Sequence, residues 1–343
     1  MAQFQHLVSA IDTHTAGEPA RIVLSGLPPI PGNTMAEKKR HMREKLDRFR
    51  TLLMLEPRGH KDMFGVVLTS PVSHEAQYGA LFIDSAGYLD MCGHSVMALA
   101  TALIETGTIP PAAPETTVVL DTPAGLVRAH AKIAGDRVQE VSVANVASFL
   151  YAADVSVDLG EQGRICVDVA FGGNFFALAR AESLGISIHP DNTARLIELG
   201  ISIKQAVNAQ LAVLHPTATH IERVELVEIY ERPEPDQPFS KNAVVFGDGQ
   251  LDRCPCGTGT SAAMAALFAK GELPLGTEYV SEGILGTRFK GRLLRESLCG
   301  DLAAVEPVVT GAAYITGIQQ VAVDPDDPFK YGFLVGSARV SPQ

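Results

Sequence analysis

The chain has 343 residues, of which 46% are hydrophobic and 20% are charged, and its formal net charge is −11. A chain of this length can bury a large core, as two domains or two halves, and its composition is that of a globular protein rather than a disordered one. The negative charge argues against a nucleic-acid-binding protein, which needs a basic surface to neutralise phosphates.

The N-terminal residues and the cysteines indicate the compartment. Residues 1–6 lack the basic and apolar regions of a secretory signal, and no apolar run approaches the ~20 residues that a membrane span needs. Five cysteines, an odd number, do not suggest a disulfide framework. We therefore expect a cytoplasmic protein with reduced thiols, and neither nucleic acid nor membrane as a partner.

Short runs that are apolar or alternate in polarity predict strands along the whole chain. In chain order they cover 4–11, 20–24, 63–69, 79–83, 117–121, 138–143, 164–169, 175–179, 220–226, 243–246, 277–281 and 312–315. Four predicted helices interrupt them, near 35–55, from Cys92 onward, near 192–213 and from Cys256 onward. The first is amphipathic and its basic residues alternate with acidic ones, which favours a solvated face over a phosphate-binding patch.

The predicted helices form two pairs, each with one polar-faced helix and one very apolar helix directly after a cysteine. A helix that is apolar on all sides must be buried on all sides, and the inside of a curled sheet offers such a place. We expect an α/β (α+β) fold of two pseudo-symmetric halves, each with a curled, mainly antiparallel sheet around a central apolar helix. The expected halves are 1–150, with Cys92, and 151–317, with Cys256, while 318–343 packs back on the first.

The same motif surrounds both of these cysteines. In each copy a phenylalanine lies 10 residues before the cysteine, an aspartate lies 8 residues before it, and a glycine lies 15 residues after it. A chain that presents one Cys-Gly-helix unit twice places two thiols in a related way. This pattern indicates acid/base chemistry by two groups on one small substrate.

Each cysteine is expected at the positive end of a helix, where free N–H groups favour a thiolate and lower the thiol pKa from ~8.5. The N–H groups that open the two helices are suited to an anion, most simply a substrate carboxylate. They belong to Gly93, His94, Gly257 and Thr258. Two facing helix ends would hold that carboxylate with a thiol on either side of the α-carbon, so that one face loses a proton and the other gains one.

The segments 90–94 (Asp-Met-Cys-Gly-His) and 252–260 (Asp-Arg-Cys-Pro-Cys-Gly-Thr-Gly-Thr) resemble the two signature motifs of the proline racemase family. The segments 12–19, 57–65 and 171–176 resemble further motifs of that family in the same order, so the resemblance covers essentially the whole chain. It implies the diaminopimelate-epimerase-like fold, with the active site between the two halves. It also implies a mechanism without cofactor or metal, and a homodimer.

The family contains three activities. Proline racemase and 4-hydroxyproline 2-epimerase invert the α-carbon with two thiols, whereas trans-3-hydroxy-L-proline dehydratases usually carry threonine at the position of Cys256. By the resemblance, Phe64 and Phe246 lie where racemases hold aromatic rings against an unsubstituted pyrrolidine. We therefore expect a proline racemase, with the epimerase and then the dehydratase as alternatives. Ser95 stands where relatives often have Asn or Gly, and a hydroxyl there suits a hydroxylated ring, so the epimerase stays open.

The resemblance also assigns the ring nitrogen's partners to His94 and Asp252. An aspartate would keep the amine cationic and so acidify the α-proton. Cys254 replaces a more usual serine and is expected to do no chemistry, because Cys-Pro-Cys has neither the spacing of a Cys-x-x-Cys redox pair nor a second ligand pair at zinc spacing. Glu18 is expected to be structural at the domain interface. A non-catalytic imino-acid-binding protein would predict the loss of a thiol, and both are present.

Overall fold

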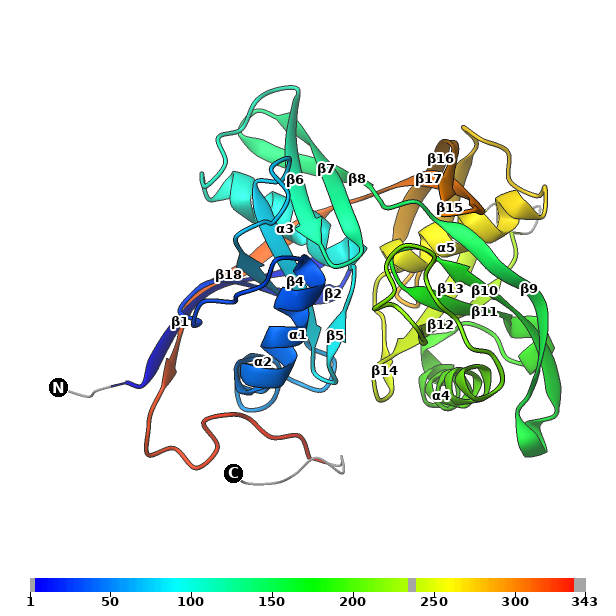
Figure 1. The fold of residues 1–343 in the computed structure, drawn as a ribbon, viewed down its shortest axis with the longest axis horizontal. Helices are drawn as coiled ribbons and strands as arrows, with labels where there is room; N and C mark the ends of the chain where they lie inside the picture. The colour runs from blue at the N-terminus through cyan, green and yellow to red at the C-terminus, as the bar shows by residue number, and fades with distance from the viewer. Residues whose placement is uncertain (1–3, 234–238, 336–343) are drawn as a thin grey trace.

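The chain folds into two lobes that lie side by side (Figure 1). The computed structural model describes residues 4–233 and 239–335. The helices are α1 (Met35–Lys45), α2 (Asp47–Met54) and α3 (Gly93–Glu105) in the first lobe, and α4 (Thr193–Gln210) and α5 (Gly257–Ala269) in the second, with the short 3-10 helices η1 (Gly160–Gln162), η2 (Ala181–Leu184) and η3 (Pro190–Asn192). None of these helices is long and apolar enough to cross a membrane.

The strands form a mixed but mainly antiparallel sheet system. Those of the first lobe are β1 (His6–Thr15), β2 (Glu18–Ser25), β3 (Phe64–Thr69), β4 (Tyr78–Asp84), β5 (Tyr88–Leu89), β6 (Glu115–Thr122), β7 (Gly125–Ala134), β8 (Arg137–Ala144) and β18 (Ala313–Val323). Those of the second are β9 (Phe149–Asp158), β10 (Arg164–Phe171), β11 (Phe175–Arg180), β12 (Val224–Glu231), β13 (Ser240–Phe246), β14 (Gln250–Leu251), β15 (Glu278–Glu282), β16 (Arg288–Cys299) and β17 (Leu302–Gly311). The described parallel pairs are β2–β3, β4–β6, β11–β12 and β13–β15.

One apolar helix runs through the middle of each lobe. Every residue of α3 from Gly93 to Ile104 is buried, and so is every residue of α5 from Gly257 to Ala266. Strands β1, β2, β7, β8 and β18 pack around α3, while β9, β10, β16 and β17 pack around α5 (Figure 1). The predicted mixed α/β fold, with an apolar helix inside a curled sheet, is confirmed.

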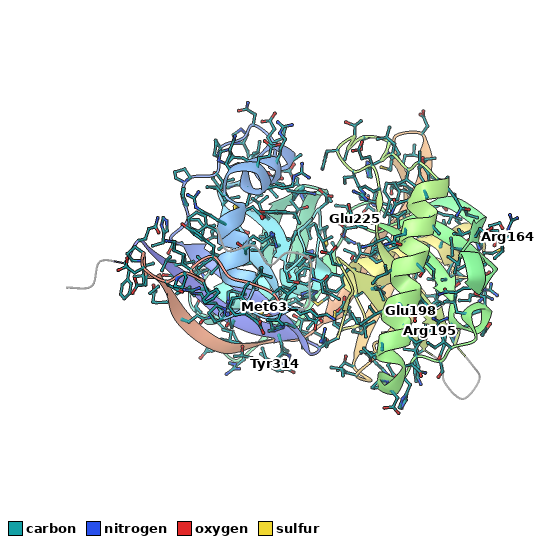
Figure 2. The ribbon with its side chains drawn as sticks, turned by 90° about the horizontal axis from the view of Figure 1, so that it is seen from below. Met63, Arg164, Arg195, Glu198, Glu225 and Tyr314 are labelled. Carbon is teal, nitrogen blue, oxygen red and sulfur yellow. The ribbon has the colours of Figure 1, made fainter. Side chains whose placement is uncertain are left out.

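The charged segment near 35–55 differs from its prediction as one helix. It is broken at Leu46, whose φ of −126° and ψ of 13° are not helical, into α1 and α2. The break lets both segments bury an apolar side: Met42 of α1 and Phe49 of α2 lie in one cluster with residues of β3 and β4. In the second lobe α4 covers the outside, and Figure 2 looks onto its solvent face, where Arg195 and Glu198 pair at 2.7 Å.

The C-terminal strand belongs to the first lobe. β18 pairs with β1 along its whole length, from His6 opposite Val323 to Thr15 opposite Ala313. Before it, β17 pairs with β8, so hydrogen bonds between strands continue from one lobe to the other. The domain boundary near residue 150 stays a prediction.

A shared core joins the lobes at the two central helices. The hydrophobic cluster that contains most of α3 also contains residues of α5, together with Cys92 and Cys256. Two further clusters lie under α4 and under α1 and α2. The two predicted thiols are therefore where the lobes meet.

Candidate active site

The starts of α3 and α5 touch each other. A Cβ atom built on Gly93 would lie 2.9 Å from the Cα of Gly257, and one built on Gly257 would lie 3.0 Å from the Cα of Gly93. A Cβ at Gly93 would be closer to backbone than real Cβ atoms come, and one at Gly257 would be at the limit, so a larger residue at either position would push the two helix starts apart. Each glycine directly follows a cysteine, and Cys92 and Cys256 thus come from different lobes to one place.

Cys92 is surrounded by polar atoms from its own helix. Its Sγ lies 3.2 Å from Nδ1 of His94 and 3.2 Å from Oγ of Ser95, and this Oγ lies 3.2 Å from Nε2 of His94. Burial lowers the pKa of His94 to about 3, so its ring is neutral at physiological pH. The Ser95 hydroxyl contacts the thiol and the imidazole.

Cys256 sits on a strained backbone at the start of α5. Its φ of 60° lies in the left-handed region, which costs a residue other than glycine on the order of 1–3 kcal/mol. In that conformation its Sγ accepts a hydrogen bond from the N–H of Gly259 at 3.4 Å and lies 3.6 Å from Oγ1 of Thr258. The sulfur is thus held over the free N–H groups of a helix end, as predicted from the spacing.

The predicted direction of the thiol pKa shift is wrong for this arrangement. Burial raises the pKa of both Cys92 and Cys256, and the negative charge of Asp252 adds to the shift in each case. The hydrogen bonds between Cys92 and Ser95, and those of Cys256 with Thr258 and Gly259, lower the thiol pKa and so act in the opposite direction. Desolvation of a sulfur enclosed between two lobes outweighs the helix-end effect, and the sequence gives no measure of that enclosure.

Two buried carboxyl groups from different lobes lie beside the thiols. Oδ1 of Asp252 accepts from the N–H of Cys254 at 3.0 Å, and Oε2 of Glu18 accepts from the N–H of Arg253 at 2.6 Å. Burial, together with the charge of Asp252, raises the pKa of Glu18 well above its usual value. Burial also raises the pKa of Asp252. Sequence reasoning gave Glu18 only an interface role, although it lies in one of the family motifs.

The two predicted aromatic residues also reach the site. Phe64 and Phe246 are buried with their ring centroids 5.3 Å apart, and Phe64 meets the His94 ring edge-on at 4.8 Å. Phe64 belongs to the first lobe and Phe246 to the second. They therefore form a joint apolar wall next to the imidazole.

An asparagine that sequence reasoning quoted but did not assign fixes the segment before Cys92. Oδ1 of Asn174 accepts from the N–H of Asp90 at 3.1 Å, and its Nδ2 donates to the carbonyl of Met91 at 2.7 Å. Asn174 belongs to the second lobe, in the turn between β10 and β11. It pairs both backbone groups across the lobe interface, which is a positioning role.

One grouping of metal-ligating atoms occurs in the described part of the chain. Donor atoms of His94, Asp252 and Cys254 lie within 4.8 Å of one another, and their types occur in zinc sites. Protein contacts account for the arrangement, because Asp252 accepts from Cys254 N–H and the Cys254 sulfur accepts from the N–H of Cys256 at 3.4 Å. We assign no metal to these residues.

The chain is similar to known proteins along its whole length. The family model "Proline racemase" matches residues 10–334. A proline racemase of Clostridioides difficile is 48% identical over 333 residues, which cover 97% of this chain and 99% of that protein. A 4-hydroxyproline 2-epimerase of Streptosporangium roseum is 43% identical over 326 residues, or 95% and 98% of the two chains. A trans-3-hydroxy-L-proline dehydratase of Burkholderia ambifaria is 40% identical over 328 residues, or 96% and 98%.

Solved structures agree with the fold. A hydroxyproline epimerase from Agrobacterium vitis with bound trans-4-hydroxy-L-proline superposes with a TM-score of 0.92, at 32% identity, over 98% of this chain and 97% of the other. A PhzF-family protein of Bacillus anthracis superposes with a TM-score of 0.55 at 14% identity, over 92% and 99%, which shows the fold alone. The chain therefore belongs to the proline racemase family, and it is an isomerase of the racemase and epimerase kind.

Proposed function

We propose that the protein is a proline racemase that inverts the α-carbon with Cys92 and Cys256 and without a cofactor. The observation that carries this proposal is the contact between Gly93 and Gly257, which brings one thiol from each lobe to a single site. The high identity to a named proline racemase supports the same choice among the family's activities.

In the proposed reaction the thiolate of one cysteine removes the α-proton from one face of the ring. The thiol of the other cysteine then donates its proton to the opposite face, so the enzyme loses and gains one proton in each turnover. The N–H groups at the starts of α3 and α5 bind the substrate carboxylate and stabilise the negative charge that develops next to the α-carbon.

The substrate itself supplies part of the electrostatics. Its ammonium nitrogen is proposed to bind between His94 and Asp252, with Glu18 next to Asp252. A cation there offsets the negative charge that raises the pKa of both thiols. The thiolate is thus favoured once the substrate is in place, which couples ionisation of the base to binding.

Ring specificity is proposed to depend on the wall made by Phe64 and Phe246. A ring hydroxyl buried against this wall without a partner costs roughly 1–3 kcal/mol, or about a 5- to 150-fold preference for proline. Ser95 supports proline as well, because its hydroxyl is already in contact with Cys92 and His94. The alternative is 4-hydroxyproline 2-epimerase, which is supported by the similarity to a structure with bound trans-4-hydroxy-L-proline.

Chiral chromatography with three substrates tests the proposal: L-proline, trans-4-hydroxy-L-proline and trans-3-hydroxy-L-proline. We expect kcat/KM to be highest for L-proline, with D-proline as the product. A preference of more than tenfold for trans-4-hydroxy-L-proline would make the protein an epimerase. Formation of a cyclic imine from the 3-hydroxy substrate would make it a dehydratase.

We also propose a homodimer in the cytoplasm, in line with the family resemblance and with five cysteines that are all free. Sedimentation velocity of the purified protein distinguishes a dimer from a monomer. Activity is expected to survive chelators and hydroxylamine and to be lost to iodoacetate. Inactivation by a chelator that added metal reverses would reject the cofactor-free mechanism.

A further inference from the structure

A fully buried carboxyl group lies beneath the second thiol and has no part in the reaction described so far. Glu228 is in the middle of β12, and its Oε1 accepts from Nδ2 of Asn242 at 3.0 Å. Its Oε2 has no hydrogen-bond partner among the described residues. Nδ2 of Asn242 also donates to the carbonyl of Pro255 at 2.8 Å, so this carboxyl group is tied to the residue directly before Cys256.

The unpartnered oxygen packs against the start of α5. A Cβ atom built on Gly259 would lie 2.3 Å from Oε2 of Glu228. The N–H of this same glycine donates to the sulfur of Cys256. The carboxyl group therefore packs directly against the backbone that holds the sulfur. Glycine at position 259 leaves room for the carboxyl oxygen.

The surroundings favour the neutral form of this carboxyl. Burial raises the pKa of Glu228 to about 8, and the charge of Asp252 adds to the shift while the hydrogen bond from Asn242 opposes it. The titratable groups that face it are Asp252 after β14, Cys256 at the start of α5 and Tyr279 of β15. None of them is a cation. A negative charge on Glu228 raises the pKa of Cys256 further.

We propose that Glu228 is a positioning residue that supports Cys256 as a neutral carboxylic acid, and that its ionisation keeps Cys256 protonated. This inference rests on the proposed function only for the role of Cys256 in proton transfer. The direct effect is on the reactivity of the thiol, which can be measured without any racemase assay.

The test uses alkylation by iodoacetamide as a function of pH, in the wild-type protein and in Glu228→Gln. Glutamine has the shape of the neutral acid and cannot ionise. Peptide mass spectrometry reports Cys256 and Cys92 separately, and Cys92 serves as the reference for access of the reagent. Above pH 8, we expect the ratio of Cys256 to Cys92 alkylation to be on the order of tenfold higher in the variant, which corresponds to about one pH unit in the thiol pKa.

Activity gives a second readout. At pH 7 the Glu228→Gln variant is expected to keep kcat and KM within about threefold, because glutamine reproduces the neutral carboxyl. A folded variant that has lost racemisation would show that the charged form is needed and overturn the inference. Equal alkylation ratios in the two proteins would show that Glu228 has only a structural role, and this result would overturn the inference as well.

Two controls keep the result interpretable. Glu231→Gln removes a carboxyl at the end of the same strand, where Oε1 accepts from the N–H of Ile188, and it should leave the alkylation ratio unchanged. If Glu228→Gln fails to fold, the wild-type protein alone tests the inference. The rate of Cys256 alkylation should then depart from the curve of a single titrating group above pH 8, and a curve that fits a single group would overturn the inference. Absence of racemisation in the wild type would reject the proposed function and leave the alkylation result intact.

Discussion

Cys254 and Cys256 are two residues apart, yet only the second has the surroundings of a base. The sulfur of Cys256 faces the N–H of Gly259 and the hydroxyl of Thr258, whereas the sulfur of Cys254 accepts from the N–H of Cys256. A serine oxygen can accept that last hydrogen bond equally well. The two thiols are therefore distinguishable by substitution.

Replacing Cys92 or Cys256 by serine should lower kcat for inversion by at least ~10²- to 10⁴-fold, because a hydroxyl is far too weak an acid to replace a thiol in proton transfer. Cys254→Ser should retain activity within a few fold. Chiral chromatography measures the rates, and circular dichroism checks the fold. An inactive Cys254 variant beside an active Cys256 variant would show that the second base is misassigned.

The raised pKa of Glu228 also predicts how the free energy of unfolding depends on pH. Its pKa is raised from 4.5 to about 8 on folding, so the folded state binds its proton more tightly. The tighter binding of the proton contributes to the free energy of unfolding. This contribution is complete below about pH 4.5 and is lost as the pH rises toward 8, by up to about 1.4 kcal/mol per pH unit. In Glu228→Gln this loss should vanish, which makes the free energy of unfolding less dependent on pH. Urea titrations at pH 5, 6, 7 and 8 test it, and parallel curves for the two proteins would contradict it.

The sequence identified the residues of the candidate site, but it did not predict the pKa shifts of the two thiols. The repeated motif and the family resemblance singled out Cys92, Cys256, His94 and Asp252, which the structure brings to one place. The raised thiol pKa was not predictable, because it depends on how completely two lobes enclose the sulfur. The exposure of single side chains was not predictable either: Cys166 lies within the predicted strand 164–169, and its side chain is on the exposed side of β10.

Among the elements, the paired helices α3 and α5 each begin with a glycine that lies against the other helix. Gly93→Ala or Gly257→Ala should push the two helix starts apart and lower kcat/KM by about 10²-fold, the cost of displacing catalytic groups by about 1 Å. Gly87→Ala is the matched control, because a Cβ there would meet no atom within 4 Å. Rates and melting temperatures should be measured together. A Gly93 variant with wild-type kcat/KM would show that the close contact is not required.

Two of the strands that the sequence did not predict share a cause. The short β5 and β14 and the longer β7, β9, β16 and β17 were not predicted. In β7 and β16 charged residues such as Arg128 and Lys290 occupy the outward positions between buried ones. A run of this kind has no apolar stretch, and pairing with its neighbours decides its conformation. The apolar helices were predictable because their burial on all sides is visible in composition alone. The break at Leu46 was not, because it depends on packing against β3 and β4.

At the scale of the whole molecule, polar contacts between the lobes position the thiols relative to each other. Asp90 of the first lobe pairs with Lys39 of the same lobe at 2.7 Å and lies 3.3 Å from His220 of the second. Asn174 adds its two hydrogen bonds to the backbone beside Asp90. The segment that leads into Cys92 is thus held from the opposite lobe.

Asn174→Ala should remove both of these hydrogen bonds and leave two buried backbone groups unpaired. We expect a loss of about 1–3 kcal/mol in the free energy of unfolding and a fall of at least about tenfold in kcat. Asn192→Ala, which removes exposed hydrogen bonds to Ser187, should change neither quantity. Denaturant titration and initial rates measure the two effects. Unchanged kcat in the Asn174 variant would rule out its positioning role.

The pairing of β1 with β18 has a consequence for biosynthesis. His6 lies opposite Val323, so β1 leaves the ribosome long before its partner β18, and strands β2 to β17 are all made in between. The second lobe, whose strands run from Phe149 to Gly311, is complete before then. Until β18 arrives, that side of β1 is an open edge with unpaired backbone groups, a surface on which other chains can add strands. The nascent protein should therefore need protection from aggregation at β1 until β18 has been made.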